Sequence, residues 1–147
     1  MGKYKFRLET LHKVREATRD ERRLALAEAF RAGEMLAAQR QELVAEEVAL
    51  REVQRSAVAG RYLDVNRLLE AQRYELLLKS RGEELAKQST LLAAEIERRR
   101  QTLVEADRDV RVLELLDERH RREHKRRQTR RETAQLDEAA LSRWHAK

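Results

Sequence analysis

The residues best suited to chemistry lie near the C-terminal end of the chain. Residues 120–124 have the sequence HRREH and match the pattern H-x-x-E-H, in which two histidines four apart on one helical face bind zinc beside a catalytic glutamate. Here the pattern lies between Arg119 and Lys125 in the most cationic stretch of the chain, where positive charge would repel Zn²⁺. We therefore expect no metal site, and we interpret His120 and His124 as solvent-exposed side chains.

No other catalytic motif is present. The sequence lacks G-x-x-x-x-G-K-[ST], G-x-G-x-x-G and G-x-S-x-G, and it has no cysteine that could act as a nucleophile or a thiolate ligand. Acidic pairs such as Glu46-Glu47 are common on solvated helices, which offer no dry pocket to shift a pKa. The sequence thus predicts a protein that is not an enzyme, with no cofactor and no small-molecule substrate.

The net charge of +6 comes from one short stretch, residues 119–131, which we call the basic segment. It contains eight Lys and Arg residues and only Glu123 as an acidic one. Such a stretch could bind phosphate backbones, as the basic region of a zipper protein does, but it has no asparagine to read base edges. We expect it to dock on an acidic protein surface. Nucleic-acid binding and a merely solvated helix are the alternatives.

The composition predicts long helices. Ala, Glu, Lys, Leu and Arg make up 96 of the 147 residues, and there is no proline to interrupt a helix. The best break is Gly60 as a C′ residue, followed by Asp64 as an N-cap. We predict one domain, residues 1–147, with a first helix at about 5–57, a turn at about 58–64 and a second helix at about 65–142.

Apolar residues recur at alternating steps of three and four, which predicts a coiled-coil seam. In the second helix the two columns are Leu85, Leu92, Arg99, Ala106 and Leu113, and Ser89, Ile96, Leu103 and Val110. The predicted fold is all-α, with two long helices forming an antiparallel coiled-coil hairpin whose C-terminal helix overhangs. Facing residues should have numbers that add to 121–123. The overhang should begin near Asp117, and its C-terminal stretch should fray without a partner.

No apolar run approaches the length of about 20 residues that spans a bilayer, and no signal region follows the basic start. We expect a cytoplasmic protein.

The two ends of the chain resemble FliJ of the bacterial flagellar export apparatus, which belongs to type III secretion. The resemblance rests on Phe6-Arg7-Leu8-Glu9-Thr10-Leu11, on Leu136-Asp137-Glu138-Ala139-Ala140-Leu141, and on the length and layout of nearly the whole chain. It implies a stalk or adaptor that couples the hexameric export ATPase to the export gate protein and to export chaperones. It also implies that the protein reaches the inner membrane only peripherally, through that apparatus. A basic coiled coil that binds nucleic acid, and a structural coiled-coil spacer, are the alternatives.

The resemblance also assigns two partner surfaces. Leu8, Leu11 and the C-terminal helix would lie at the ATPase end, where we expect the charge to come from Arg121, Arg122, Lys125, Arg126, Arg127, Arg130 and Arg131. A stripe near the turn would face the gate, interrupted here by Glu46 and Arg81. Its members are Gln39, Leu43, Leu50, Tyr74, Leu78 and Leu85.

Overall fold

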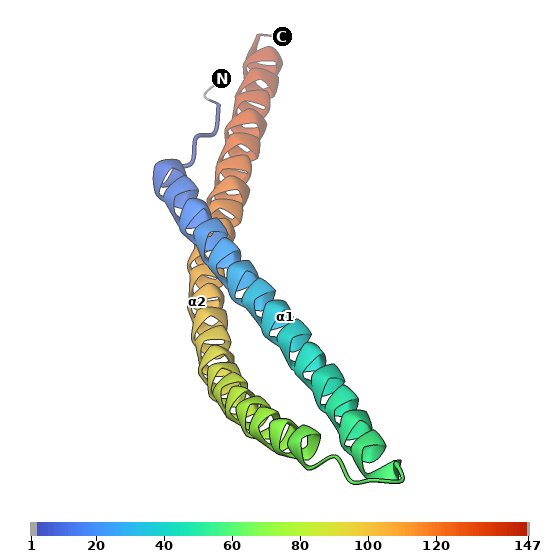
Figure 1. Ribbon diagram of the computed structural model, residues 1–147. Helices are drawn as coiled ribbons and strands as arrows, with labels where there is room; N and C mark the ends of the chain where they lie inside the picture. Colours follow the sequence, from blue (N-terminus) through green and yellow to red (C-terminus); the bar gives the residue numbers. More distant parts are fainter. Residues whose placement is uncertain (1–2, 147) are drawn as a thin grey trace. The chain divides into compact units, whose positions relative to one another are not determined.

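The computed structural model describes residues 3–146, which form two long helices joined by a short non-helical segment (Figure 1). Helix α1 spans Glu9–Ala59 and helix α2 spans Val65–His145. Within residues 3–146 there is no strand, and the two helices pack against each other, so the all-α prediction is confirmed. Neither helix contains a stretch both long and apolar enough to cross a membrane.

Helix α1 begins four residues later than the predicted residue 5. The N–H of Glu9 donates to the carbonyl of Phe6 at 3.3 Å, and the N–H of His12 donates to the carbonyl of Leu8 at 2.9 Å. The carboxylate of Glu9 suits the positive end of the helix dipole. Residues 3–8 stay outside the helix, and contacts to α2, described below, hold them there.

Two features were predicted for the turn, a C′ residue at Gly60 and an N-cap at Asp64. Helix α1 ends at Ala59, directly before Gly60, but Gly60 does not adopt the positive φ that is typical of a C′ glycine. The chain reverses instead with the N–H of Asp64 donating to the carbonyl of Ala57 at 3.3 Å. The N-cap is confirmed, because Asp64 Oδ1 accepts the N–H of Arg67 at 3.1 Å.

The chain divides into two compact units, each containing a part of both helices. The terminal unit comprises residues up to 22 and from 103 onward, and the turn unit comprises residues 23–102. In the turn unit, contacts join Ala25 to Arg99 and Leu43 to Gly82, so the facing numbers add to 124 and 125. Arg15 and Asp109 in the terminal unit also add to 124. The helices therefore run antiparallel within each unit.

This register is shifted from the predicted 121–123. The predicted turn, residues 58–64, is centred on residue 61, whereas the observed non-helical segment, residues 60–64, is centred on residue 62. A reversal centred one residue later increases the sum of facing numbers by two, which accounts for the shift.

Buried residues follow the predicted heptad columns. In the turn unit, Leu50, Ala71 and Leu78 form a buried cluster, with Leu43 packed against it. In the terminal unit, Ala106, Val110 and Leu113 are buried at steps of four and three. Each unit is therefore held by a narrow apolar seam, and most other side chains face solvent.

Candidate partner-binding surfaces

The N-terminal segment, residues 3–8, lies along α2 in the terminal unit, and we call it the strap. Its Phe6 ring centroid is 6.1 Å from that of His120, and its Tyr4 ring centroid is 5.5 Å from that of His124. Residues two apart in an extended chain share a side, and residues four apart in a helix share a face. That match of spacings lets the strap cover two successive turns of α2.

The strap changes the interpretation of the H-x-x-E-H pattern. His120 and His124 are half-buried beneath the aromatic rings of the strap, so the prediction that both are solvent-exposed is wrong. Phe6 is buried, with 8% of its surface exposed. The two histidines continue the three-and-four spacing of the seam, and aromatic side chains from the strap replace the helix that would otherwise cover them.

Hydrogen bonds fix the strap at Asp117. The Tyr4 hydroxyl donates to Asp117 Oδ1 at 2.8 Å, and Arg121 lies 3.0 Å from Asp117 Oδ2. The Arg121 guanidinium also lies 5.6 Å from the centre of the Tyr4 ring, within cation–π range. Desolvation and the hydrogen bond to Asp117 raise the pKa of Tyr4. Burial opposes ionisation of Asp117, but hydrogen bonds from Tyr4 and Arg121 hold its pKa below the ordinary value.

These contacts correct the predicted start of the overhang. Lys3, Tyr4 and Lys5 line a cleft together with His124 and Arg127 of α2. Part of the chain therefore still covers α2 ten residues beyond Asp117, where the overhang was expected to begin. Helix α2 then continues to His145, and from residue 129 onward its described side chains are all exposed. Fraying of this stretch without a partner stays a prediction.

The basic segment presents exposed charge on α2. Some of it is paired along the helix, since Arg122 lies 3.8 Å from Glu118 and Arg127 lies 3.9 Å from Glu123. Four basic side chains of this segment have no acidic group within 4.0 Å among residues 3–146. They are Lys125, Arg126, Arg130 and Arg131. Lys125, Arg126 and Arg130 line one groove along this helix together with the paired Arg122 and with Asp137. The charges of these three residues are not neutralised by any described acidic group within 4.0 Å.

The two leucines expected at the ATPase end also belong to the terminal unit. Leu8 is half-buried at the end of the strap, and Leu11 is exposed on the first turns of α1. Leu11 is thus available to a partner, while Leu8 is partly covered by its own chain.

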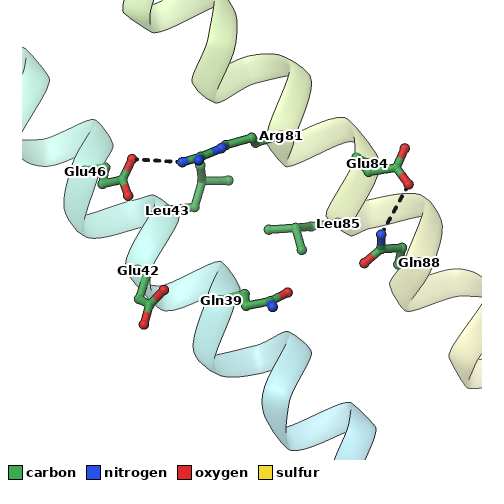
Figure 2. A pocket seen from close by; sticks show the side chains of 8 residues that line it. All are labelled: Gln39, Glu42, Leu43, Glu46, Arg81, Glu84, Leu85 and Gln88. Carbon is green, nitrogen blue, oxygen red and sulfur yellow. Dashed lines mark hydrogen bonds and ion pairs between the residues drawn. The ribbon is translucent and has the colours of Figure 1, made fainter.

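In the turn unit, three of the residues expected on the gate side line one cleft between α1 and α2. Figure 2 shows Gln39 and Leu43 on α1 facing Leu85 on α2. At one end of this cleft Glu46 and Arg81 form an ion pair at 3.5 Å. The two charges that interrupt the stripe in the sequence therefore pair with each other across the helices.

Tyr74 joins this ion pair, because its hydroxyl donates to Glu46 Oε2 at 2.7 Å. That hydrogen bond raises the pKa of Tyr74. Leu50 and Leu78, by contrast, are buried in the seam. They hold the two helices together, so their expected place on the partner-facing surface is corrected. Sequence spacing identified the right columns but did not separate inward positions from those at the edge.

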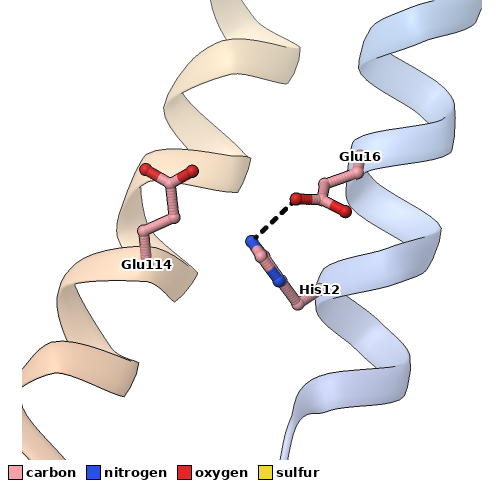
Figure 3. A group of neighbouring side chains, drawn as sticks. All are labelled: His12, Glu16 and Glu114. Carbon is pink, nitrogen blue, oxygen red and sulfur yellow. Dashed lines mark ion pairs between the residues drawn. The ribbon is translucent and has the colours of Figure 1, made fainter.

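A second group of polar residues, which the sequence did not predict, lies in the terminal unit (Figure 3). Ligand-capable atoms of His12, Glu16 and Glu114 lie within 4.8 Å of one another, and they are the described residues best placed to hold a cation. His12 Nε2 is 3.4 Å from Glu16 Oε1, and Arg111 is 3.2 Å from Glu114. We interpret the group as ion pairs. The four-residue spacing of His12 and Glu16 was visible in the sequence, but the approach of Glu114 depends on the register.

Comparison with known families identifies the chain. Residues 4–147 match the family model described as flagellar FliJ protein. Comparisons with curated proteins and with solved structures found no match. The family match includes the strap from Tyr4 onward, both helices and the basic segment, and on this coverage the chain belongs to the flagellar FliJ protein family.

Proposed function

We propose that this FliJ-family protein is a non-enzymatic stalk of the flagellar export apparatus that couples the export ATPase ring to the export gate and to chaperones. The observation that carries the proposal is the terminal unit, in which the strap and α2 together present a basic surface. The family match supports a place in flagellar export, and the surfaces described above support the assignment of partners.

The proposed architecture is an antiparallel coiled-coil hairpin with an overhanging C-terminal helix. The antiparallel contacts within each unit and the seam spacing support it. Helices of this length suit a stalk, since α2 alone has 81 residues, which correspond to about 120 Å at 1.5 Å per residue. The proposed location is cytoplasmic and peripheral at the inner membrane.

The basic segment is the proposed contact with the ATPase ring. Arg126, Arg130 and their unpaired neighbours carry charge that α2 does not neutralise. Exposed charges of one sign steer a partner of the opposite sign and fix its orientation more than they add affinity. The proposed contact with the gate is the cleft lined by Gln39, Leu43 and Leu85, with Tyr74 at its edge.

The test is the ATP hydrolysis rate of the cognate export ATPase with and without the full chain, at two salt concentrations. The parent chain should stimulate hydrolysis more strongly at low salt. Replacing Arg126, Arg127, Arg130 and Arg131 by Glu should abolish stimulation and leave the helical circular dichroism signal intact, because these side chains are exposed.

A control variant replaces four arginines of the turn unit by Glu and changes the net charge equally. These are Arg55, Arg61, Arg67 and Arg73. It should retain stimulation. Equal stimulation by both variants would remove the basic segment from the mechanism.

Nucleic-acid binding is tested with the same variants. Random duplex DNA should bind weakly to the parent chain. Tight binding that falls steeply with salt, together with no effect on the ATPase, would favour the nucleic-acid alternative. Melting that depends on protein concentration would favour a spacer that associates with itself.

A further inference from the structure

Apolar side chains gather without cover where α1 and α2 are joined. Tyr62 is 84% exposed, Leu63 59% and Val65 54%, and Val58 and Leu69 are also exposed. We call these five residues the apolar tip. Neither the seam nor the gate-side cleft includes any of them. Exposed apolar residues that lie together usually mark a surface for a partner or a membrane.

The tip is exposed because the seam ends before it. The buried seam residues nearest the turn are Ala57 on α1 and Ala71 on α2. Between them lie the last residues of α1, the non-helical residues 60–64 and the first residues of α2. Where a chain reverses beyond the last contact between two helices, no third element covers it. Large apolar side chains there stay exposed to solvent, so folding does not stabilise them by burial.

Two of the three charged residues within the span of the tip are positive. Residues 58–69 contain Arg61 and Arg67 against Asp64 alone, with Glu52 and Arg55 before them and Glu70 after them. Asp64 Oδ1 accepts the backbone N–H of Arg67 and so caps the positive end of α2. The guanidinium of Arg55 lies 3.8 Å from Glu52, whereas the guanidinium groups of Arg61 and Arg67 have no acidic group within 4.0 Å among residues 3–146.

We infer that the apolar tip docks on an anionic lipid bilayer. Tyrosine favours the boundary between headgroups and acyl chains, and Leu63 and Val65 can enter the acyl region beside it. Arginine can bury its stem and hold its guanidinium at the level of lipid phosphates, which suits Arg61 and Arg67. Charge complementarity therefore favours an anionic lipid surface. The inference goes beyond the proposed function, which requires no lipid contact.

The experiment must locate the contact, because the basic segment could also attract anionic vesicles. Trp144 is the only tryptophan and lies near the other end of α2. A variant with Tyr62→Trp and Trp144→Phe places the fluorophore at the tip. Vesicles of phosphatidylcholine with about one-third phosphatidylglycerol should shift its emission to shorter wavelength, and pure phosphatidylcholine vesicles should shift it much less. In the parent chain the emission of Trp144 should not move.

Vesicle flotation of the full chain supplies the matched comparison. Replacing Tyr62, Leu63 and Val65 by Ser should weaken binding to anionic vesicles about tenfold or more. Replacing Leu136, Leu141 and Trp144 by Ser removes three exposed apolar residues from the other end of α2 and should leave binding unchanged. Circular dichroism verifies that both variants keep their helices.

Any of three results would overturn the inference. The first is an emission from the Tyr62→Trp variant that is the same with and without anionic vesicles. The second is a Ser variant of the tip that binds vesicles as the parent does, and the third is sedimentation showing that the tip instead joins two copies of the chain. None of these measurements involves the ATPase, so failure of lipid docking and failure of the stalk proposal are distinguishable.

Discussion

Leu78 shows how much of the fold depends on single seam residues. It is 1% exposed and packs with Leu50 and Ala71 in the turn unit. Leu78→Ala should reduce the free energy of unfolding by about 2–5 kcal/mol, because it removes apolar contacts and leaves a cavity. Urea denaturation of the full chain measures the loss.

The control for Leu78 is Leu76, two residues earlier and exposed. Leu76→Ala should change the free energy of unfolding by no more than about 0.5 kcal/mol. Equal losses in the two variants would mean that Leu78 is not a seam residue.

Glu95 is a second single residue that affects stability, and its contribution should depend on pH. Hydrogen bonds from Arg98 and Arg99 lower its pKa from 4.5 to about 2. A carboxyl whose folded pKa is lowered stabilises the fold above its unfolded pKa, and this stabilisation is lost as pH falls through the folded value. Glu95→Gln should therefore be less stable than the parent chain at pH 7, and the difference should vanish between about pH 4.5 and 2.

Thermal unfolding at a series of pH values measures this difference. Glu97→Gln is the matched control, since among the described residues Glu97 pairs with one arginine, Arg100, at 3.5 Å. A difference between parent and Glu95→Gln that stays constant from pH 7 to 2 would contradict the role of the Arg98 and Arg99 hydrogen bonds.

At the scale of elements, the sequence predicted both helices and the break between them from local signals. The absence of proline, the heptad spacing and the Asp64 N-cap all act within a few residues. The strap could not be predicted this way, since Tyr4 bonds to Asp117, 113 residues away. The register also depends on the length of the turn, which local signals give only to within a few residues.

Removing the aromatic rings of the strap should make the covered part of α2 more accessible to a protease. Tyr4→Ala with Phe6→Ala removes the rings over His124 and His120. Trypsin should then cleave after the arginines at 119–127 several-fold faster, because that part of α2 loses its cover and opens more often. Cleavage rates of the full chain, followed by mass spectrometry, measure the effect.

Cleavage within residues 55–73 is the internal control for the strap variant, since those residues belong to the other compact unit. Their cleavage rate should not change. An unchanged rate at 119–127 would show that the strap does not protect α2.

At the scale of the whole molecule, the basic segment could be read from the sequence because charge is a sum over neighbouring residues. The gate-side stripe could be read only in part. Leu43 and Leu50 are seven residues apart, as are Leu78 and Leu85, so heptad spacing gives each pair one position. Burial separates Leu50 and Leu78 from Leu43 and Leu85, which line the cleft. Burial depends on how the two helices face each other, which a one-dimensional pattern does not specify.

We propose that the terminal unit binds the export ATPase. Hydrogen–deuterium exchange of the full chain, alone and with the hexameric ATPase, tests this directly. Exchange should slow in the strap and in residues 113–131 and should not change at residues 55–69. Protection confined to residues 55–69, or no protection anywhere in the presence of a bound hexamer, would contradict this proposal.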